Sequence, residues 1–121
     1  MPVPILKQGD MLIASIVAAM SDHDLVELRD EIAQRIGKFR AKGLVIDVTA
    51  LDVLDSFATR TLRGIAYIAR LRGAEAVIVG IQPEVALAMV QLGLTLDDVH
   101  TALDLEAGIA LLGRVGKPGR A

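Results

Sequence analysis

The chain of 121 residues has no cysteine and no tryptophan, and aromatic residues make up only 2% of it. The absence of cysteine excludes disulfides, thiolate metal ligands and cysteine nucleophiles, and it favours a reducing cytoplasm. The scarcity of aromatic rings leaves no stacking platform for nucleic-acid bases. With 13 basic and 15 acidic residues, the formal charge of −2 argues against a broad basic surface for nucleic acid.

Long hydrophobic runs are also missing. The longest uncharged apolar stretch, Met11 to Met20, is shorter than the roughly 20 residues that a membrane helix needs. Met1-Pro2-Val3-Pro4 lacks the basic start of a secretion signal. Even so, 53% of the residues are apolar, and the mean hydropathy is +0.51. A small domain has little interior for so much apolar surface, so we expect part of it to contact other chains.

The order of apolar runs predicts an α/β fold in one domain. Two short runs around Gln8-Gly9-Asp10 predict an N-terminal antiparallel hairpin, and continuous apolar runs predict strands buried on both faces. The predicted strands are Ile5–Lys7, Met11–Ile16, Leu44–Val48, Ala76–Ile81 and Val99–Thr101. About four helices are expected, starting near Ser21, Ser56, Pro83 and Asp104, the first closed by Gly43. We expect a mixed sheet within residues 1–113 and a disordered tail over residues 114–121.

Motifs for catalysis or cofactor binding are few. His23 and His100 have no metal-type or catalytic partner at informative spacing, so both are interpreted as structural. The 11 glycines form neither a Walker loop nor a dinucleotide fingerprint. Asp47 could be the phosphate acceptor of a receiver domain, but the expected acidic pair after the first parallel strand is missing. We therefore expect no catalytic residue, cofactor or metal. A receiver-like or small catalytic domain remains an alternative.

Ser56 stands where the apolar strand Leu44–Val48 gives way, through the acidic turn Asp52-Val53-Leu54-Asp55, to a helix. A hydroxyl there is expected to be exposed and open to modification. A phosphate on it would meet the positive end of the helix and would be repelled by the carboxylates of Asp52 and Asp55. The competing interpretation is that Ser56 only caps the helix, since serine is a preferred N-cap residue.

The segment from Leu44 to Ser56, an apolar strand ending in aspartate, a short loop and Asp-Ser before a helix, resembles the hallmark of the STAS domain family. Three further segments resemble the RsbS-type, single-domain group of that family, which forms the scaffold of the bacterial stressosome. These segments are Phe57–Leu62, Ala74–Pro83 and Gln91–Leu103, so the resemblance covers nearly the whole chain.

This resemblance implies a STAS fold and a non-enzymatic, phosphorylation-switched scaffold and antagonist in the cytoplasm. Ser56 would be phosphorylated by an RsbT-type serine/threonine switch kinase and dephosphorylated by a serine phosphatase. The chain would assemble with copies of itself and with RsbR-type STAS sensor proteins, hold the kinase, and release it on phosphorylation. No nucleic acid or membrane partner is implied. The alternative within the family is a free anti-anti-sigma factor that binds an anti-sigma kinase.

The residues around Ser56 complete the predicted site. Arg60 and Arg63 follow Ser56 by one and two helical turns, and arginine pairs readily with phosphate. With Asp55 and Thr59 they form the predicted set of phosphate or kinase contacts. The alternative is that both arginines are solvated on an exposed face.

Overall fold

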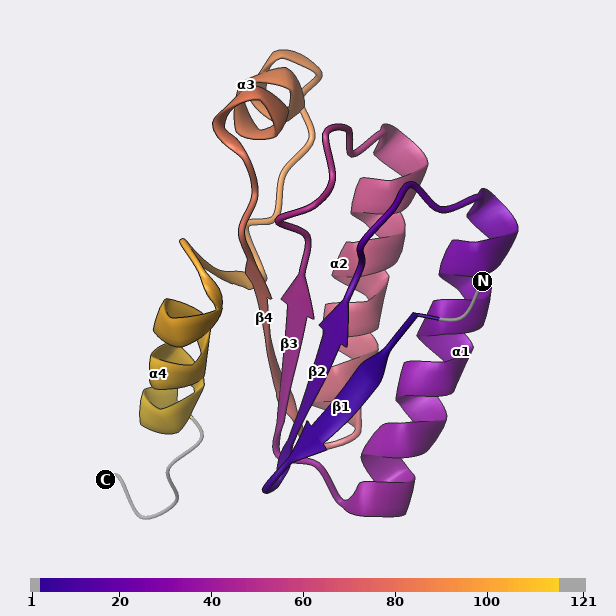
Figure 1. The fold of residues 1–121 in the computed structure, drawn as a ribbon, viewed down its shortest axis with the longest axis vertical. Helices are drawn as coiled ribbons and strands as arrows, with labels where there is room; N and C mark the ends of the chain where they lie inside the picture. Colours follow the sequence, from indigo (N-terminus) through magenta and orange to yellow (C-terminus); the bar gives the residue numbers. More distant parts are fainter. Residues whose placement is uncertain (1–2, 116–121) are drawn as a thin grey trace.

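The computed structural model describes residues 3–115, which form one five-stranded sheet with helices on both faces (Figure 1). The strands lie side by side in chain order: β1 (Ile5–Gln8), β2 (Met11–Ser15), β3 (Gly43–Asp47), β4 (Glu75–Val79) and β5 (His100–Ala102). β1 pairs antiparallel with β2, and every later pair is parallel. The predicted mixed sheet with an N-terminal hairpin is therefore confirmed.

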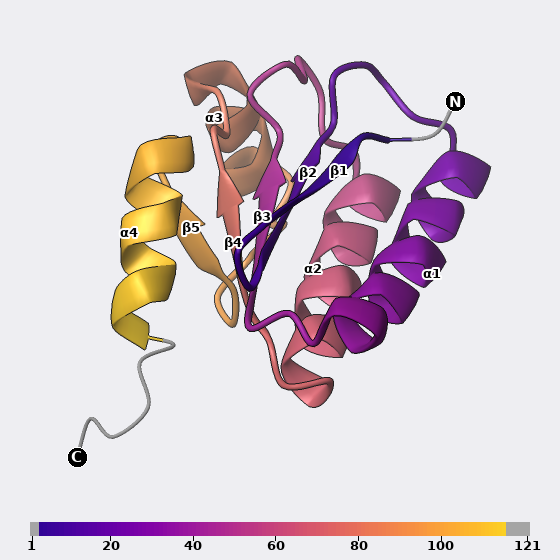
Figure 2. The ribbon, with the colours of Figure 1, turned by 60° about the horizontal axis from the view of Figure 1, so that its bottom comes forward.

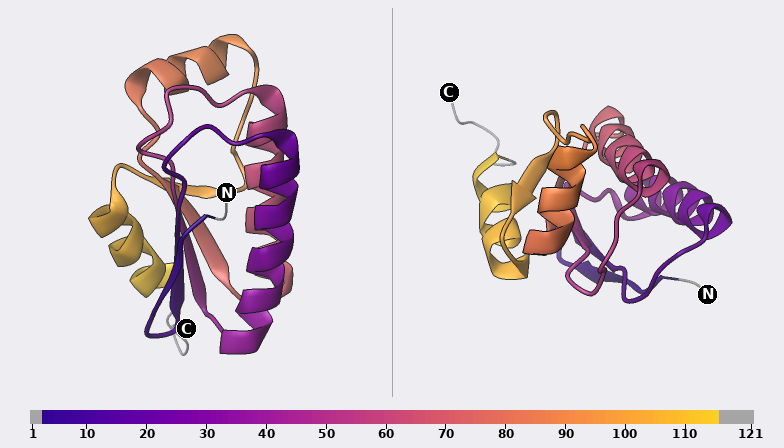
Figure 3. Two further views of the ribbon diagram at one scale, coloured as in Figure 1. Left: turned by 45° about the vertical axis from the view of Figure 1, so that its right-hand side comes forward. Right: turned by 90° about the horizontal axis from the view of Figure 1, so that it is seen from above.

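The helices divide unequally between the two faces of the sheet. α1 (Asp22–Phe39) and α2 (Ser56–Leu71) run side by side over one face, and α4 (Leu105–Val115) covers the other (Figure 2). α3 (Pro83–Gln91) lies beyond the carboxyl ends of the strands (Figure 3). This arrangement explains the unbroken apolar run of β3, because Leu44 and Ile46 pack in the core under α1 and α2 while Val45 packs under α4.

The end of α1 differs from its prediction. Gly43 is not the residue that closes the helix but the first residue of β3. Arg40 instead adopts the left-handed conformation, with φ of 50°, and its N–H reaches the carbonyls of Gly37 and Ile36. The reversal must be completed early, because only Ala41 and Lys42 remain to carry the chain back to the sheet. An arginine therefore takes the place that glycine fills more easily.

The predicted start of α1 near Ser21 is confirmed. Ser21 and Asp24 form a reciprocal capping box at the start of α1, where the sequence predicts that a helix begins. The backbone N–H and the hydroxyl of Ser21 hold the pKa of the Asp24 carboxyl below its usual value. His100 contacts Glu75 of the neighbouring strand, with 3.2 Å between Nε2 and Oε1. At the other end of the fold, α4 continues to Val115, two residues past the predicted domain boundary, and residues 116–121 of the predicted tail lie outside the described residues.

The parallel connections bring the carboxyl ends of β2, β3 and β4 to the same end of the sheet. The loops that leave these ends, and α3, therefore form one end of the molecule (Figure 1). Ser56 lies there, at the start of α2. Within residues 3–115 no helix is long and apolar enough to cross a membrane.

Candidate functional site

The loop from β3 to α2 is held by apolar side chains that alternate with exposed polar ones. Val48, Leu51 and Leu54 are buried in the main core. Asp52, Asp55 and Ser56 are exposed. The buried leucines fix the path of the loop, so the acidic residues and the serine are presented together to solvent.

The start of this loop is fixed by side-chain hydrogen bonds to its backbone. Asp47 Oδ1 accepts from the backbone N–H of Thr49 at 2.9 Å and from its hydroxyl at 2.6 Å. Gln82, which precedes α3, donates from Nε2 to the carbonyl oxygen of Thr49 at 2.6 Å. Asp47 therefore has a structural role in a local turn, of the kind that aspartate side chains commonly form.

Gly80 is required beside this turn for two separate reasons. Its φ of +83° is unfavourable for a residue with a side chain, and an added Cβ would collide with the side chain of Thr49. We expect Gly80→Ala to lower the free energy of unfolding by about 2–4 kcal/mol, from backbone strain and overpacking together. Urea denaturation will measure this. Gly113→Ala is the matched control, since nothing lies within 4 Å of its added Cβ, and an equal loss in both variants would contradict the assignment.

The cap of α2 contradicts the competing interpretation, in which Ser56 only caps the helix. Asp55 is the N-cap residue, and its Oδ1 accepts from the backbone N–H of Ala58 at 2.7 Å. Ser56 is the first residue of the helix and is exposed. Capping is thus performed by the neighbouring carboxylate, and the Ser56 hydroxyl is left facing solvent.

Asp55 should therefore contribute more to stability than Ser56. We expect Asp55→Ala to lower the free energy of unfolding by about 0.5–2 kcal/mol, the usual cost of losing a capping side chain. Asp52→Ala is the control, because Asp52 is also an exposed carboxylate of the loop and its removal should change stability by less than about 0.5 kcal/mol. Thermal unfolding of the two variants will decide this, and a larger loss in Asp52→Ala would contradict the capping role.

The structure separates the predicted contact residues on α2 into surface and core. Arg60 is exposed, and Arg63 donates from Nη1 to the carbonyl oxygen of Thr95 at 2.9 Å. Thr59 is only 1% exposed, and its hydroxyl has no hydrogen-bond partner among the described residues. The prediction that Thr59 contacts a phosphate or a kinase is therefore wrong, because its side chain does not reach the surface. Thr61 donates its hydroxyl to the carbonyl of Phe57 at 2.8 Å.

An apolar hollow next to Ser56 was not predicted. It has a volume of about 120 Å³ and lies between the loop before α1, the loop before α2 and the first turns of α2, with Met20, Leu54 and Ala58 in its lining. Val53 at its rim is 73% exposed, although it stands between acidic and apolar residues of the loop. An apolar residue inside an acidic turn was the available sequence signal. The site therefore combines an exposed hydroxyl, two carboxylates and an apolar depression.

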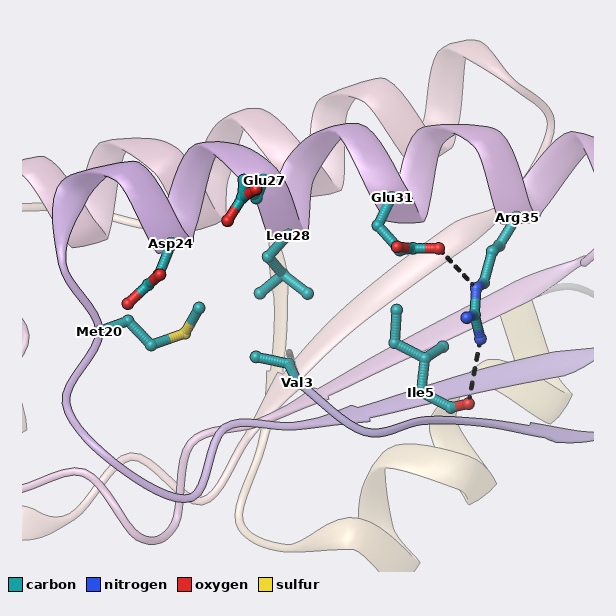
Figure 4. Close-up of a pocket in the computed structure, with 8 residues that line it drawn as sticks. All are labelled: Val3, Ile5, Met20, Asp24, Glu27, Leu28, Glu31 and Arg35. Carbon is teal, nitrogen blue, oxygen red and sulfur yellow. Dashed lines mark hydrogen bonds and ion pairs between the residues drawn. The ribbon is translucent and has the colours of Figure 1, made fainter. Parts of the chain in front are cut away.

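A second groove, between β1 and α1, has a different character (Figure 4). Its volume is about 280 Å³, and Glu27 and Glu31 line it above an apolar floor that includes Leu28. Arg35 closes one end, where Nε contacts Glu31 at 2.9 Å and Nη1 reaches the carbonyl oxygen of Ile5 at 3.4 Å. The bond to Ile5 ties α1 to the edge strand. Within residues 3–115, no group of three or more histidine or carboxylate side chains is placed to hold a metal ion.

Comparison with protein families matches residues 3–107 to the STAS domain. The curated relatives include two proteins of Bacillus subtilis strain 168. RsbT co-antagonist protein RsbRA is 26% identical over 100 residues, and RsbRD is 24% identical over 98 residues. These alignments cover 83% and 81% of this chain but 36% and 35% of the relatives, so the chain spans about a third of the length of the curated proteins it matches.

Solved structures match over a larger share of both chains. RsbS of Moorella thermoacetica, in a variant with glutamate in place of a serine, is 38% identical, with a TM-score of 0.80 and coverage of 93% of this chain and 96% of the other. A chain from a study of the molecular architecture of the stressosome, described there as a signal integration and transduction hub, is also 38% identical, with a TM-score of 0.77 and coverage of 94% and 99%. The anti-sigma factor antagonist SpoIIAA in its unphosphorylated form is 13% identical, with a TM-score of 0.66 and coverage of 93% and 96%, and shares the fold.

Proposed function

The chain belongs to the STAS domain family and is similar over almost its whole length to RsbS, and from this premise we propose that it is a phosphorylation-switched scaffold of a stressosome-type signalling complex. In this role it holds a serine/threonine switch kinase and releases it when Ser56 is phosphorylated. The chain itself performs no catalysis and acts in the cytoplasm. The kinase phosphorylates Ser56, and an opposing serine phosphatase removes the phosphate.

The observation that carries this proposal is the exposed Ser56 as the first residue of α2, directly after the capping Asp55. Since Asp55 makes the capping hydrogen bond, Ser56 can be modified without removing the helix cap. The helix N-terminus carries a partial positive charge that tolerates a phosphate. The fold should therefore survive modification, and the change should be confined to the surface.

The physical effect of the phosphate is electrostatic. It adds about −1.5 to −2 charges near neutral pH. Asp52 and Asp55 already place two carboxylates in the same exposed loop. After phosphorylation, a partner docked over this loop would have to desolvate a cluster of three anionic groups. The cost of that desolvation would favour dissociation of the partner. We propose that this repulsion releases the kinase.

Arg60 is the residue of this chain best placed to contact the phosphate. It follows Ser56 by four residues, which puts both side chains on the same side of α2. Arg63 lies one turn further, but its guanidinium already binds the carbonyl of Thr95. We therefore assign the direct phosphate contact to Arg60 and a kinase-facing role to Arg63.

The proposed partners follow from the names of the relatives. RsbRA and RsbRD are RsbT co-antagonists, and the stressosome chain comes from a signal integration hub. We propose an RsbT-type kinase as the partner that is held and RsbR-type STAS proteins as the partners in assembly, with further copies of this chain. No nucleic acid or membrane contact is part of the proposal.

The test is to incubate the chain with the RsbT-type kinase of the same genome and ATP, and to map the phosphate by mass spectrometry. One phosphate per chain on Ser56 is expected. The chain incubated with ATP but without the kinase is the control and should remain unmodified. Phosphate confined to Thr61, or autophosphorylation without the kinase, would refute the proposal.

A further inference from the structure

The outer side of α2 carries a row of side chains that begins at Ser56. Arg60, Arg63, Tyr67 and Arg70 follow Ser56 by 4, 7, 11 and 14 residues, a spacing that keeps all of them on one side of the helix. At a rise of 1.5 Å per residue, the row extends roughly 21 Å from Ser56. We call these four residues the arginine row.

The arginine row is cationic on a chain that is negative overall. α2 contains three arginines and no acidic residue, whereas the whole chain has a formal charge of −2. Arg70 donates from Nη2 to the carbonyl oxygen of Asp98 at 2.9 Å, as Arg63 does to that of Thr95. Backbone carbonyls satisfy single donors but bring no negative charge, so the guanidinium charges remain available to an anionic group.

The row surrounds a hollow of about 290 Å³ between α2 and the loop that precedes β5. Its lining comprises Arg60, Arg63, Gly64, Tyr67, Arg70, Asp98 and Val99. Tyr67 is 59% exposed. The hollow is therefore a surface depression lined by three arginines, one aspartate and one aromatic ring, and the charges of its lining are positive in sum.

Gly64 lies in the lining of the hollow. Glycine in the middle of a helix is unfavourable relative to alanine. Among residues 3–115 no contact requires it, since an added Cβ would meet no atom within 4 Å and its φ is not positive. With no side chain at this position, the hollow is deep enough to admit a side chain of another molecule.

From these observations we propose that the hollow is a docking site for an acidic segment of the kinase that phosphorylates Ser56, an inference that rests on the proposed function. The length of the row, from Ser56 to Arg70, favours a polypeptide over a small ligand. An acidic side chain enters the hollow over Gly64 between the guanidinium groups, while the rest of the partner reaches Ser56. The site thus positions the partner relative to the hydroxyl that it modifies.

The test measures the affinity of the RsbT-type kinase, loaded with a non-hydrolysable ATP analogue, for variants of the full chain by calorimetry. Arg70→Glu and Gly64→Gln should each raise the Kd about tenfold, the first by reversing a charge and the second by filling the hollow. Arg114→Glu, on α4, is the charge-matched control and should leave the Kd within about twofold. Gly64→Ala should raise the melting temperature by about 4 °C, which shows that the glycine is not needed for folding.

Equal Kd values for the wild type and both hollow variants would overturn this inference, while phosphate mapping on Ser56 would still support the proposed function. Failure of the wild-type chain to bind the kinase would overturn both. Sedimentation of the chain alone tests whether a second copy of the chain occupies the hollow. If Arg70→Glu and Gly64→Gln abolish self-association, the hollow is occupied by a second copy, and the inference is wrong.

Discussion

Ser56→Ala is expected to lose all kinase-dependent phosphorylation while remaining as stable as the wild type. The hydroxyl is the only group removed, and the cap of α2 is made by Asp55. The change in the free energy of unfolding should therefore stay within about 0.5 kcal/mol, as for other exposed positions. Phosphate incorporation and thermal unfolding of the same preparation will measure both effects.

The control for this experiment is Thr61→Ala, which removes a nearby hydroxyl of α2 and should leave incorporation unchanged. Ser56→Asp tests the electrostatic mechanism, because it adds one negative charge where phosphate adds nearly two. It should weaken kinase binding less than the phosphate does. Normal incorporation into Ser56→Ala would show that another hydroxyl is the acceptor.

A second large effect is expected on mixing the chain with an RsbR-type STAS protein. The 12.9 kDa chain should move into particles far larger than a dimer. Its surface supplies apolar residues for such contacts, since Leu87 and Val90 on α3 and Leu103 after β5 are each more than 60% exposed. Size-exclusion chromatography with light scattering will measure the masses.

The matched control for assembly is the same chain with SpoIIAA, which shares the fold at 13% identity and should not co-elute with it. Separate elution of this chain and the RsbR-type protein at working concentration would contradict the scaffold role. A small complex with an anti-sigma factor would then favour the alternative of a free anti-anti-sigma factor.

Much of the fold could be predicted because local signals and packing agree. The turn Gln8-Gly9-Asp10 lies between two apolar runs, and Gly9 indeed has a φ of +63°. The continuous apolar sequence of β3 predicted burial on both faces, which α1 and α2 on one side and α4 on the other provide. In these segments the local sequence pattern is compatible with only one type of structure.

The errors occurred where neighbouring residues compete for one position. Asp55 and Ser56 are both preferred N-cap types, and the choice between them depends on where Leu51 and Leu54 anchor the loop. That anchoring is a tertiary effect. The position of Gly43 was likewise decided by the short connection from α1 to β3, which makes the chain turn at Arg40.

The burial of Thr59 could have been found from the sequence. Thr59, Leu62, Ala66 and Ala69 follow one another at intervals of three, four and three residues, and all are buried. This is the spacing of a single helical face. Thr59 was placed at the surface because it is polar, although its position on the apolar face of α2 indicates the core. The arginine row lies on the neighbouring side of α2, where Arg60, Tyr67 and Arg70 are exposed.

Phosphorylation of Ser56 is proposed to release the kinase from the complex. The most direct measurement starts from the assembled complex of this chain, its RsbR-type partner and the kinase, to which ATP is added. Kinase that remains with the large particles and phosphate on Ser56 are followed in the same samples over time. We expect release to parallel Ser56 phosphorylation in the wild type and to be absent in Ser56→Ala. Equal release from both proteins, or release before any phosphate is found on Ser56, would contradict the account.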